Sequence, residues 1–386
     1  MSAAAFPVTR ERDELNVSSR GDSFSILFSL DLPLVFAVVG LTLVGIYSLS
    51  GAVNGITALM PTAKKQLFFF GVAGVAMMAS CLIHYRWLNR LAMLLYVLNI
   101  GALIFTLVGG SRINGARSWI DIGPVNWQPA ETMKIATVLV CAQWLALHSD
   151  KLQGWSAIFI PGLICGAPAL LILMQPDLGT ASLFFVMFLS MMLMAGVDRR
   201  KLGLLLFAAM LGVCSAYPFL KPYQKARIGV FMNPELDPQG KGYNVIQSKV
   251  AIGAGGILGD GWGQGSQSIH RFLPEHHTDF IFAATVEQFG LLGGLIVIGG
   301  FGLIFWRMIR AMDNARDRFG GIVVAGLIAV VASHLFLNAG MTMGMVPCTG
   351  IPLPLFSYGG SFIVTSYILF GLVLNVASRR YTFIGQ

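Results

Sequence analysis

Two stretches of the sequence place ionisable side chains directly before apolar runs. The stretch LPEHHTDFIFA (273–283) brings two histidines and two acids to one such place, with Asp279 nearest to the run. Glu131 and Lys134 open another run. A carboxylate in such a position can take a proton from an attacking hydroxyl, and a cation can stabilise a departing phosphate. The pattern therefore predicts acid–base chemistry at the ends of helices.

The same residues also have a purely structural explanation. A carboxylate in the first turn of a helix can cap free N–H groups and meets the positive end of the helix dipole, which would account for Asp279, Glu131 and Asp177. Glu131 and Lys134 are three apart on one helix face, and in water such a pair contributes only about 0.2–0.5 kcal/mol. Charges at a membrane edge are costly, however, which favours a polar cavity there.

Two neighbouring motifs carry weaker chemical signals. His276 and His277 could ligate a metal, but without HxxxH or HExxH spacing a surface pair is the simpler explanation. Ser357 lies in SYGGS, whose glycines are typical of a flexible re-entrant turn.

The composition predicts an all-α polytopic membrane protein. Of the 386 residues, 55% are hydrophobic and only 11% charged, and the apolar residues form repeated runs of about 20 residues. The net charge of +8 does not indicate a nucleic-acid partner, because the basic residues lie singly or in short groups beside apolar runs, as topology and anionic lipids require. The five cysteines, without CxxC spacing, indicate neither a disulfide framework nor a metal cluster.

We expect about ten spans in a single membrane domain over 24–386, preceded by a charged tail over 1–23 that lacks a cleavable signal. An even number of spans places both termini on one side, and Lys and Arg are enriched in the short segments on that side, which predicts that it is cytoplasmic. The expected spans are 26–48, 66–83, 88–109, 131–148, 156–174, 180–197, 203–220, 279–306, 321–345 and 360–378.

A long segment between the seventh and eighth spans is the most unusual part of the chain. Residues 221–278 are rich in Gly and Pro and lie outside the cell by this topology. A weakly amphipathic piece near 242–252 could lie on the membrane surface. The apolar and aromatic residues in this loop argue against disorder and favour a functional loop.

Most of the unusual polar residues fall on the predicted outer face. Two acids, Glu131 and Asp279, with the cations Arg117, Lys134 and Arg227 form the combination expected for a lipid-linked phosphate substrate. The cations would hold a pyrophosphate, and a carboxylate would deprotonate the attacking hydroxyl.

Seven motifs, in their order and spacing, resemble the SEDS family of shape, elongation, division and sporulation proteins. The resemblance covers nearly the whole chain after the N-terminal tail, and Ala130, where Ser is common, is a small departure. Two of the motifs, GYNVIQSKVAIGAGG and GIPLPLFSYGGS, look more like elongation members than division members. The seven motifs are RSWIDIG, QPAETMKIA, QPDLGT, NPELDPQGKGYNVIQSKVAIGAGG, LPEHHTDFIFA, EQFGLLG and GIPLPLFSYGGS.

The resemblance implies a glycosyltransferase that polymerises the peptidoglycan precursor lipid II outside the bacterial cytoplasmic membrane. It also implies a class B penicillin-binding protein as transpeptidase partner, together with other elongation-complex proteins and membrane lipids. On the family's motifs, Asp279, Glu131 and Lys134 fall at catalytic positions. The substrate-binding candidates are Arg117, Arg227, Asp177, Gln247, His277 and Ser357.

In the hypothesised mechanism Asp279 is the general base, Glu131 orients Lys134, and a divalent cation, Mg²⁺ or Mn²⁺, assists the leaving pyrophosphate. Two other functions stay open. A lipid II flippase would need functional polar residues near the membrane midplane and on both faces. A non-catalytic scaffold for the transpeptidase would not need Asp279.

The predicted topology can be tested by labelling single cysteines in a variant that lacks the native ones. Cysteines at Gln239 and Gln267 should react with a membrane-impermeant thiol reagent added to spheroplasts, because the long loop is expected outside. A cysteine at Asn314 should not react. The opposite pattern would invert the topology and place Asp279 on the cytoplasmic side.

Overall fold

The structure, a computed structural model, describes residues 29–53, 60–83, 85–113, 116–123, 125–216, 218, 225, 229–237, 240–270, 272–273 and 275–379. The predicted tail over 1–23, Arg227 and Gln239 lie outside these ranges.

The predicted all-α membrane fold is confirmed. Within the described ranges, nine helices are long and apolar enough to cross a membrane. A further helix, α8 (Arg199–Ala216), occupies the seventh predicted span and begins with three basic residues. The nine helices are α2 (Leu32–Ala52), α3 (Met60–Leu82), α4 (Tyr85–Gly109), α5 (Pro129–Leu147), α6 (Ser156–Met174), α7 (Leu178–Ala195), α12 (Ile281–Asp313), α13 (Arg318–Thr342) and α14 (Gly360–Ser378).

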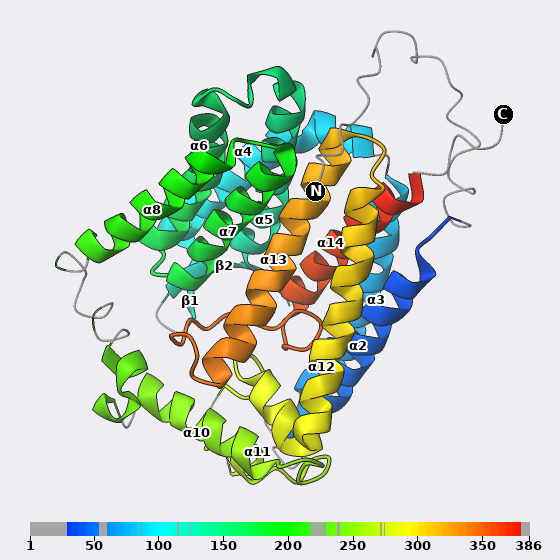
Figure 1. Cartoon of the computed structure of the whole chain (residues 1–386). Coiled ribbons are helices and arrows are strands. Elements are labelled where there is room, and N and C mark those ends of the chain that lie inside the picture. Colours follow the sequence, from blue (N-terminus) through cyan, green and yellow to red (C-terminus); the bar gives the residue numbers. More distant parts are fainter. Residues whose placement is uncertain are drawn as a thin grey trace.

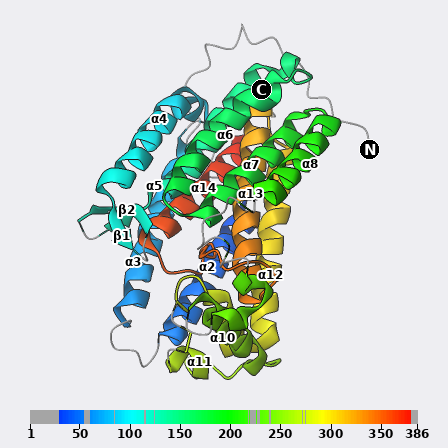
Figure 2. The same cartoon turned by 90° about the vertical axis from the view of Figure 1, so that its left-hand side faces the viewer.

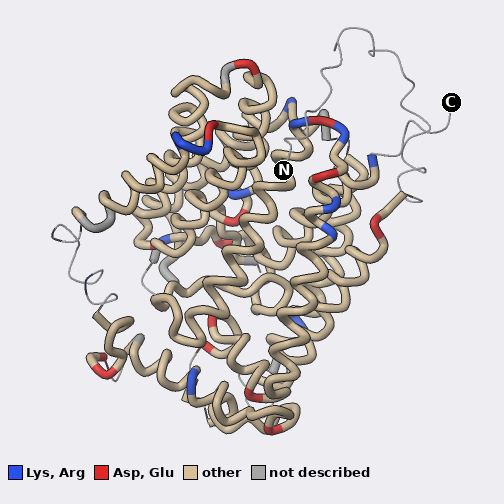
Figure 3. Tube along the Cα trace, viewed as in Figure 1, with Lys and Arg blue, Asp and Glu red and all other residues tan. Residues whose placement is uncertain are grey.

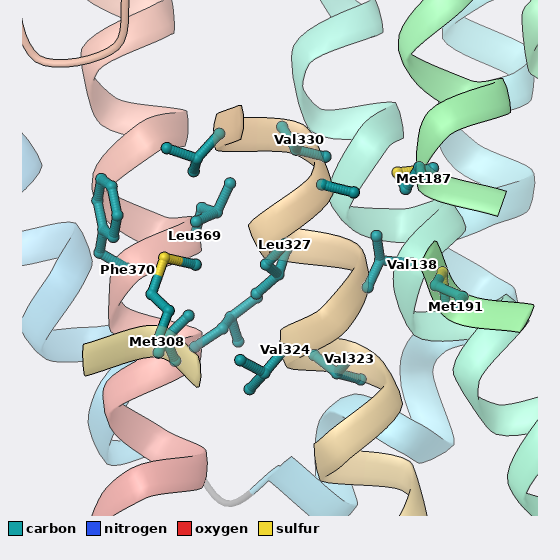
Figure 4. Packing of buried hydrophobic residues seen from close by; sticks show 14 of the residues in the cluster. Val138, Met187, Met191, Met308, Val323, Val324, Leu327, Val330, Leu369 and Phe370 are labelled. Carbon is teal, nitrogen blue, oxygen red and sulfur yellow. The ribbon is translucent and has the colours of Figure 1, made fainter. Parts of the chain in front are cut away.

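Helices α5, α13 and α14 form the centre of the bundle, and α4 lies at its edge (Figures 1 and 2). Figure 4 shows the packing between them, where Leu327 and Val330 of α13 lie among side chains of α5, α7 and α14. At Gly326 an added Cβ would lie 2.9 Å from both Val138 of α5 and Met191 of α7. The missing side chain therefore lets α13 approach both helices closely.

A small antiparallel sheet departs from the purely helical expectation. Its strands β1 (Ser111–Ile113), β2 (Ala116–Ile122) and β3 (Val125–Trp127) pair in that order between α4 and α5. The segment is too short and too polar to span a membrane, and pairing its strands satisfies backbone groups that a coil would leave to water. Strand β3 ends two residues before α5 and so leads the chain into Glu131.

The long loop between α8 and α12 contains helices of its own. Helix α10 (Lys241–Ala254) covers the amphipathic piece expected near 242–252, and α11 (Ser266–Ile269) and a 3₁₀ turn (Pro234–Leu236) lie beside it in the sequence. Figure 1 places α10 and α11 at one end of the molecule, and Figure 3 shows most Lys and Arg residues nearer the other end.

The eighth predicted span, 279–306, is wrong as a single straight helix. Helix α12 is interrupted at Gly290, whose φ of 64° and ψ of −161° are not helical. Before Gly290 the chain runs parallel to α2, since Thr285 contacts Ser48 and Gln288 lies against Gly51.

After Gly290 the chain runs antiparallel to α2. Gly300 lies against Leu41, and further on Arg307 forms an ion pair with Asp31 at 2.6 Å. The segment is therefore a helical hairpin, with a short arm over 281–289 and a spanning arm over 291–313. Figure 1 shows this turn at the lower end of the yellow ribbon. Hydropathy could not reveal the reversal, because both arms are apolar.

The glycine-rich part of the long loop holds the turn of the hairpin. The N–H groups of Leu291 and Leu292, which begin the second arm, donate to the carbonyls of Gly256 and Ile257 at 2.9 and 3.3 Å. The buried carboxylate of Glu287 accepts hydrogen bonds from the backbone N–H of Gln267 and the hydroxyl of Ser268, both at 2.7 Å. The loop and the short arm are thus one structural unit.

Replacing Gly290 by alanine should strongly destabilise this unit. The backbone there adopts a conformation open to glycine but strained for other residues, and an added Cβ would lie 2.3 Å from the carbonyl oxygen of Ile257. Thermal unfolding of the purified protein in detergent should show a lower melting temperature for Gly290→Ala.

Gly299→Ala is the matched control. It lies in the same α12, and an added Cβ would meet nothing within 4 Å. Alanine favours helix over glycine by about 0.5–1 kcal/mol, so this variant should melt at or above the wild-type temperature. Equal melting temperatures for Gly290→Ala and Gly299→Ala would contradict the hairpin turn at Gly290.

Candidate active site

Helix α5 carries a buried ion pair in its first turns. Pro129 begins the helix, with its fixed φ suited to the first position, and Glu131 and Lys134 follow on one face. Lys134 Nζ lies 2.8 Å from Glu131 Oε2. The two residues are only 4% and 2% exposed, so the pair lies inside the bundle and not at an exposed membrane edge.

A third ionisable residue, His334 of α13, completes this group. Its Nε2 lies 2.7 Å from Lys134 Nζ, and its Nδ1 lies 2.9 Å from the carbonyl oxygen of Pro352. His334 was not among the residues predicted from the sequence, although an ionisable residue within a predicted span is itself a signal for function. Its pairing with Lys134 required the packing of α5 against α13.

The group Glu131–Lys134–His334 borders a small cavity of about 20 Å³, room for roughly one water molecule. Mostly apolar side chains line the rest, together with the hydroxyls of Thr365 and Ser366, and the ring of Phe362 lies 5.9 Å from Lys134 Nζ. The cavity keeps the ammonium in an environment of low polarity, where its interactions with Glu131 and any ligand are strong.

Asp279 lies in a turn before the short arm of the hairpin. Helix α12 begins at Ile281 with Phe280 as its N-cap residue, so Asp279 lies outside the first helical turn, where capping had offered a structural explanation. Its Oδ2 would lie 3.1 Å from a Cβ added to Gly350. The carboxylate is half-buried against the loop that precedes α14.

This loop, residues 350–359, has the sequence GIPLPLFSYG and is hydrogen-bonded to the turn that carries Asp279. The hydroxyl of Ser357 accepts from the N–H of Leu353 at 2.7 Å and donates to the carbonyl of Thr278 at 2.6 Å. The N–H of Tyr358 donates to the carbonyl of His277 at 3.0 Å. Ser357, predicted to bind substrate, thus uses its hydroxyl to hold the loop.

Asn338 of α13 helps to connect the turn that carries Asp279 with the Glu131–Lys134–His334 group. Its Nδ2 donates to the carbonyl oxygens of Asp279 at 2.8 Å and Ile351 at 2.7 Å. Asn338 lies one helical turn after His334, which holds the neighbouring carbonyl of Pro352. One face of α13 therefore links Asp279, through loop 350–359, to the Glu131–Lys134–His334 group.

His277 supplies no charge to Asp279 at neutral pH. Burial and the neighbouring imidazole of His276 lower the pKa of His277, and Glu275 only partly opposes this. Its ring lies 6.2 Å from the ring of Tyr358, and its buried Nδ1 has no hydrogen-bond partner among the described residues. His277, two residues before Asp279 in the chain, is therefore a neutral side chain at this pH.

The remaining predicted residues make other contacts or lie outside the described ranges. Asp177 caps α7 by accepting from the N–H of Thr180 at 2.9 Å, which fits the structural explanation. Arg117, on β2, donates to the carbonyl of Val108 at 3.2 Å. Gln247 is half-buried on α10, and Arg227 is not described.

The described side chains do not form a metal site by themselves. Within those ranges no three His, Cys, Asp or Glu residues come together as a group that could hold a metal ion. We therefore derive no step through a metal, and Mg²⁺ or Mn²⁺ stays a prediction of the sequence.

A family model described as a cell cycle protein, FTSW_RODA_SPOVE, matches residues 29–382. The chain is 37% identical to the peptidoglycan glycosyltransferase MrdB of Escherichia coli K12, over 74% of this chain and 77% of that one. It is 32% identical to the peptidoglycan glycosyltransferase RodA of Treponema pallidum, over 91% and 98%. It is 36% identical to a probable peptidoglycan glycosyltransferase FtsW of Thiomicrospira cyclica, over 81% of each.

Two solved structures have the same fold. A chain from a peptidoglycan synthase complex, described as coordinating polymerization and crosslinking, superposes with a TM-score of 0.79 at 29% identity, covering 92% of this chain and 99% of that one. The rod shape determining protein RodA of Thermus thermophilus superposes with a TM-score of 0.69 at 27% identity, covering 91% and 98%.

Removing the cation of the buried pair should destabilise the fold more than removing both charges. Lys134→Met leaves the carboxylate of Glu131 buried without its ion-pair partner, which costs about 3–5 kcal/mol. The double variant Glu131→Gln/Lys134→Met leaves no charge to desolvate. Its melting temperature in detergent should lie close to that of the wild type and well above that of Lys134→Met.

Both variants should lack enzymatic activity, because the double variant restores packing without restoring the cation. If the single and double variants melted at the same temperature, the pair would not be as desolvated as the structure indicates.

Proposed function

The chain belongs to the FtsW/RodA/SpoVE family of cell cycle proteins, and we propose that it polymerises lipid II into β-1,4-linked glycan strands at the outer face of the bacterial cytoplasmic membrane. Several of its curated relatives are named peptidoglycan glycosyltransferases, and it shares that enzyme class with them. It is a multi-pass membrane protein, and both termini are proposed to be cytoplasmic.

One observation supports this function above the others. Asp279 and the Glu131–Lys134 pair, an acid and a cation from distant parts of the sequence, are joined through Asn338, His334 and loop 350–359. Glycosyl transfer from a pyrophosphate donor needs both kinds of group, a base for the acceptor and positive charge for the leaving group.

In the proposed mechanism Asp279 takes the proton of the acceptor's N-acetylglucosamine 4-hydroxyl as its oxygen attacks C1 of the donor N-acetylmuramic acid. The bond from C1 to the pyrophosphate oxygen breaks, and undecaprenyl pyrophosphate leaves with the bonding electrons. Attack on the opposite face converts the α-linked donor into a β-1,4 linkage. Lys134, with Arg117 and Arg227, would balance the charge that develops on the pyrophosphate.

We assign the chain to the elongation role of RodA and not to the division role of FtsW. The motifs GYNVIQSKVAIGAGG and GIPLPLFSYGGS support this choice. The structural neighbour from a peptidoglycan synthase complex supports a class B penicillin-binding protein as the crosslinking partner.

A lipid II flippase is the second candidate, and one observation favours it. Glu131, Lys134 and His334 lie buried among membrane helices, and ionisable residues so placed are typical of transport pathways. Asp279 distinguishes the two functions, because only the polymerase needs a base at the acceptor hydroxyl.

Asp279→Asn should lower polymerisation at least 100-fold, because the amide keeps the shape of the side chain but cannot accept the proton. The assay is glycan-strand formation from purified lipid II by the protein reconstituted with its cognate transpeptidase. Glu275→Gln is the matched control, since Glu275 lies in the same turn, is similarly half-buried and accepts a hydrogen bond from the hydroxyl of Thr278 that glutamine can also accept. It should retain near wild-type activity.

Polymer from Asp279→Asn at the wild-type rate would show that Asp279 is not the general base. Transbilayer movement of labelled lipid II by the wild type, without polymer, would instead favour the flippase.

A further inference from the structure

His334 is a buried ionisable residue to which the proposed mechanism gives no role. Its side chain is 3% exposed, and it lies on α13 between the cavity and loop 350–359. Both of its ring nitrogens have a partner, Lys134 Nζ on one side and the carbonyl of Pro352 on the other. A buried polar side chain whose hydrogen-bonding atoms all have partners is typical of one that fixes the positions of its neighbours.

The two contacts assign the tautomer of the ring. An ammonium group can only donate hydrogen bonds, so His334 Nε2 accepts from Lys134. A carbonyl oxygen can only accept, so Nδ1 carries the proton and donates to Pro352. The neutral Nδ1–H imidazole satisfies both contacts while Lys134 keeps its charge.

The contacts also determine how Lys134 can meet a ligand. An ammonium group has three N–H donors. Glu131 and His334, on two different helices, take two of them, and no described residue takes the third. A free lysine side chain samples many rotamers, and two fixed acceptors restrict Lys134 to few of them before a ligand arrives.

From this geometry we infer that His334 is a positioning residue: its Nε2 orients the ammonium of Lys134 so that the third N–H is directed to the pyrophosphate of the departing lipid. The inference rests on the proposed function. It concerns the orientation of the cation, while Glu131 supplies the counter-charge.

The contact with Lys134 distinguishes this role from a purely structural one, in which His334 would only hold loop 350–359 through its hydrogen bond to Pro352. Loop 350–359 is also held by Asn338 on Ile351, by Ser357 on Thr278 and by Gln66, whose Nε2 donates to the carbonyl of Ser357 at 3.2 Å. Loss of the bond to Pro352 would remove one contact among several. Loss of Nε2 would remove one of only two acceptors that the described residues offer Lys134.

Two substitutions separate the ring nitrogens. The carbonyl oxygen of glutamine can reach the position of Nε2 and accept from Lys134, so His334→Gln keeps the contact that the inference requires. The amide of asparagine reaches only the position of Nδ1, so His334→Asn keeps the bond to Pro352 and loses the contact with Lys134. The shared polar amide makes them a matched pair.

In the lipid II polymerisation assay, we expect His334→Gln to stay within about threefold of the wild-type kcat. His334→Asn should lower kcat by about 10- to 100-fold with little change in KM or melting temperature, as is usual when a residue that orients a functional group is lost. Ser190→Ala removes a 2.9 Å hydrogen bond from α7 to α13 and should leave kcat unchanged.

A second readout does not depend on polymerisation. Reductive methylation followed by mass spectrometry should modify Lys134 faster in His334→Asn than in wild type or His334→Gln, because a freed ammonium samples more positions. If the wild type makes no polymer but this pattern holds, the proposed function fails and the positioning of Lys134 stands.

Three results would overturn the inference while the wild type remains active. Normal kcat in His334→Asn would show that Lys134 needs no orientation from the ring. Loss of activity only in His334→Gln would show that the hydrogen bond to the carbonyl of Pro352, and not the contact with Lys134, is the one that matters. Loss of activity in both variants together with a lower melting temperature would make its role structural.

Discussion

Irregular backbone inside a helical membrane bundle must find its hydrogen-bond partners within the protein, because lipid offers none. Loop 350–359 meets this requirement with partners from three other elements. Asn338 and His334 of α13 hold its first carbonyls, Gln66 of α3 holds its end, and the turn before α12 accepts the N–H of Tyr358. The partners that satisfy the loop are thereby fixed relative to one another. The site is assembled as a consequence of that requirement.

The same requirement accounts for the ionisable groups on α5. A charge removed from water is stable only when paired and hydrogen-bonded, and the Glu131–Lys134 pair gains its extra hydrogen bond from His334. Fold stability and the proposed chemistry consequently depend on the same three side chains. A structural ion pair would be equally well served by apolar replacements. An arrangement that leaves one ammonium hydrogen without a described partner is instead suited to a ligand.

The sequence predicted most of the spans and the motifs of the site, because hydropathy and motif spacing are local properties. It could not predict the partner of Lys134, since His334 lies 200 residues away and meets it only through the packing of α5 on α13. Nor could it separate Asp177, whose carboxylate caps α7, from Asp279, which lies outside its helix. Both acids precede an apolar run, and only the backbone geometry distinguishes them.

The hairpin in α12 also determines how far Asp279 lies from the turn at Gly290. Its short arm comprises residues 281–289, and at 1.5 Å per residue it places the turn at Gly290 about 13 Å from the start of the arm. Asp279 lies before the start of that arm, so the length of the arm separates it from the hairpin turn, and its half-buried carboxylate lies against loop 350–359. In the proposed polymerase, the acceptor hydroxyl must therefore reach an acid that lies within the protein, while the lipid tail of the substrate can stay in the bilayer.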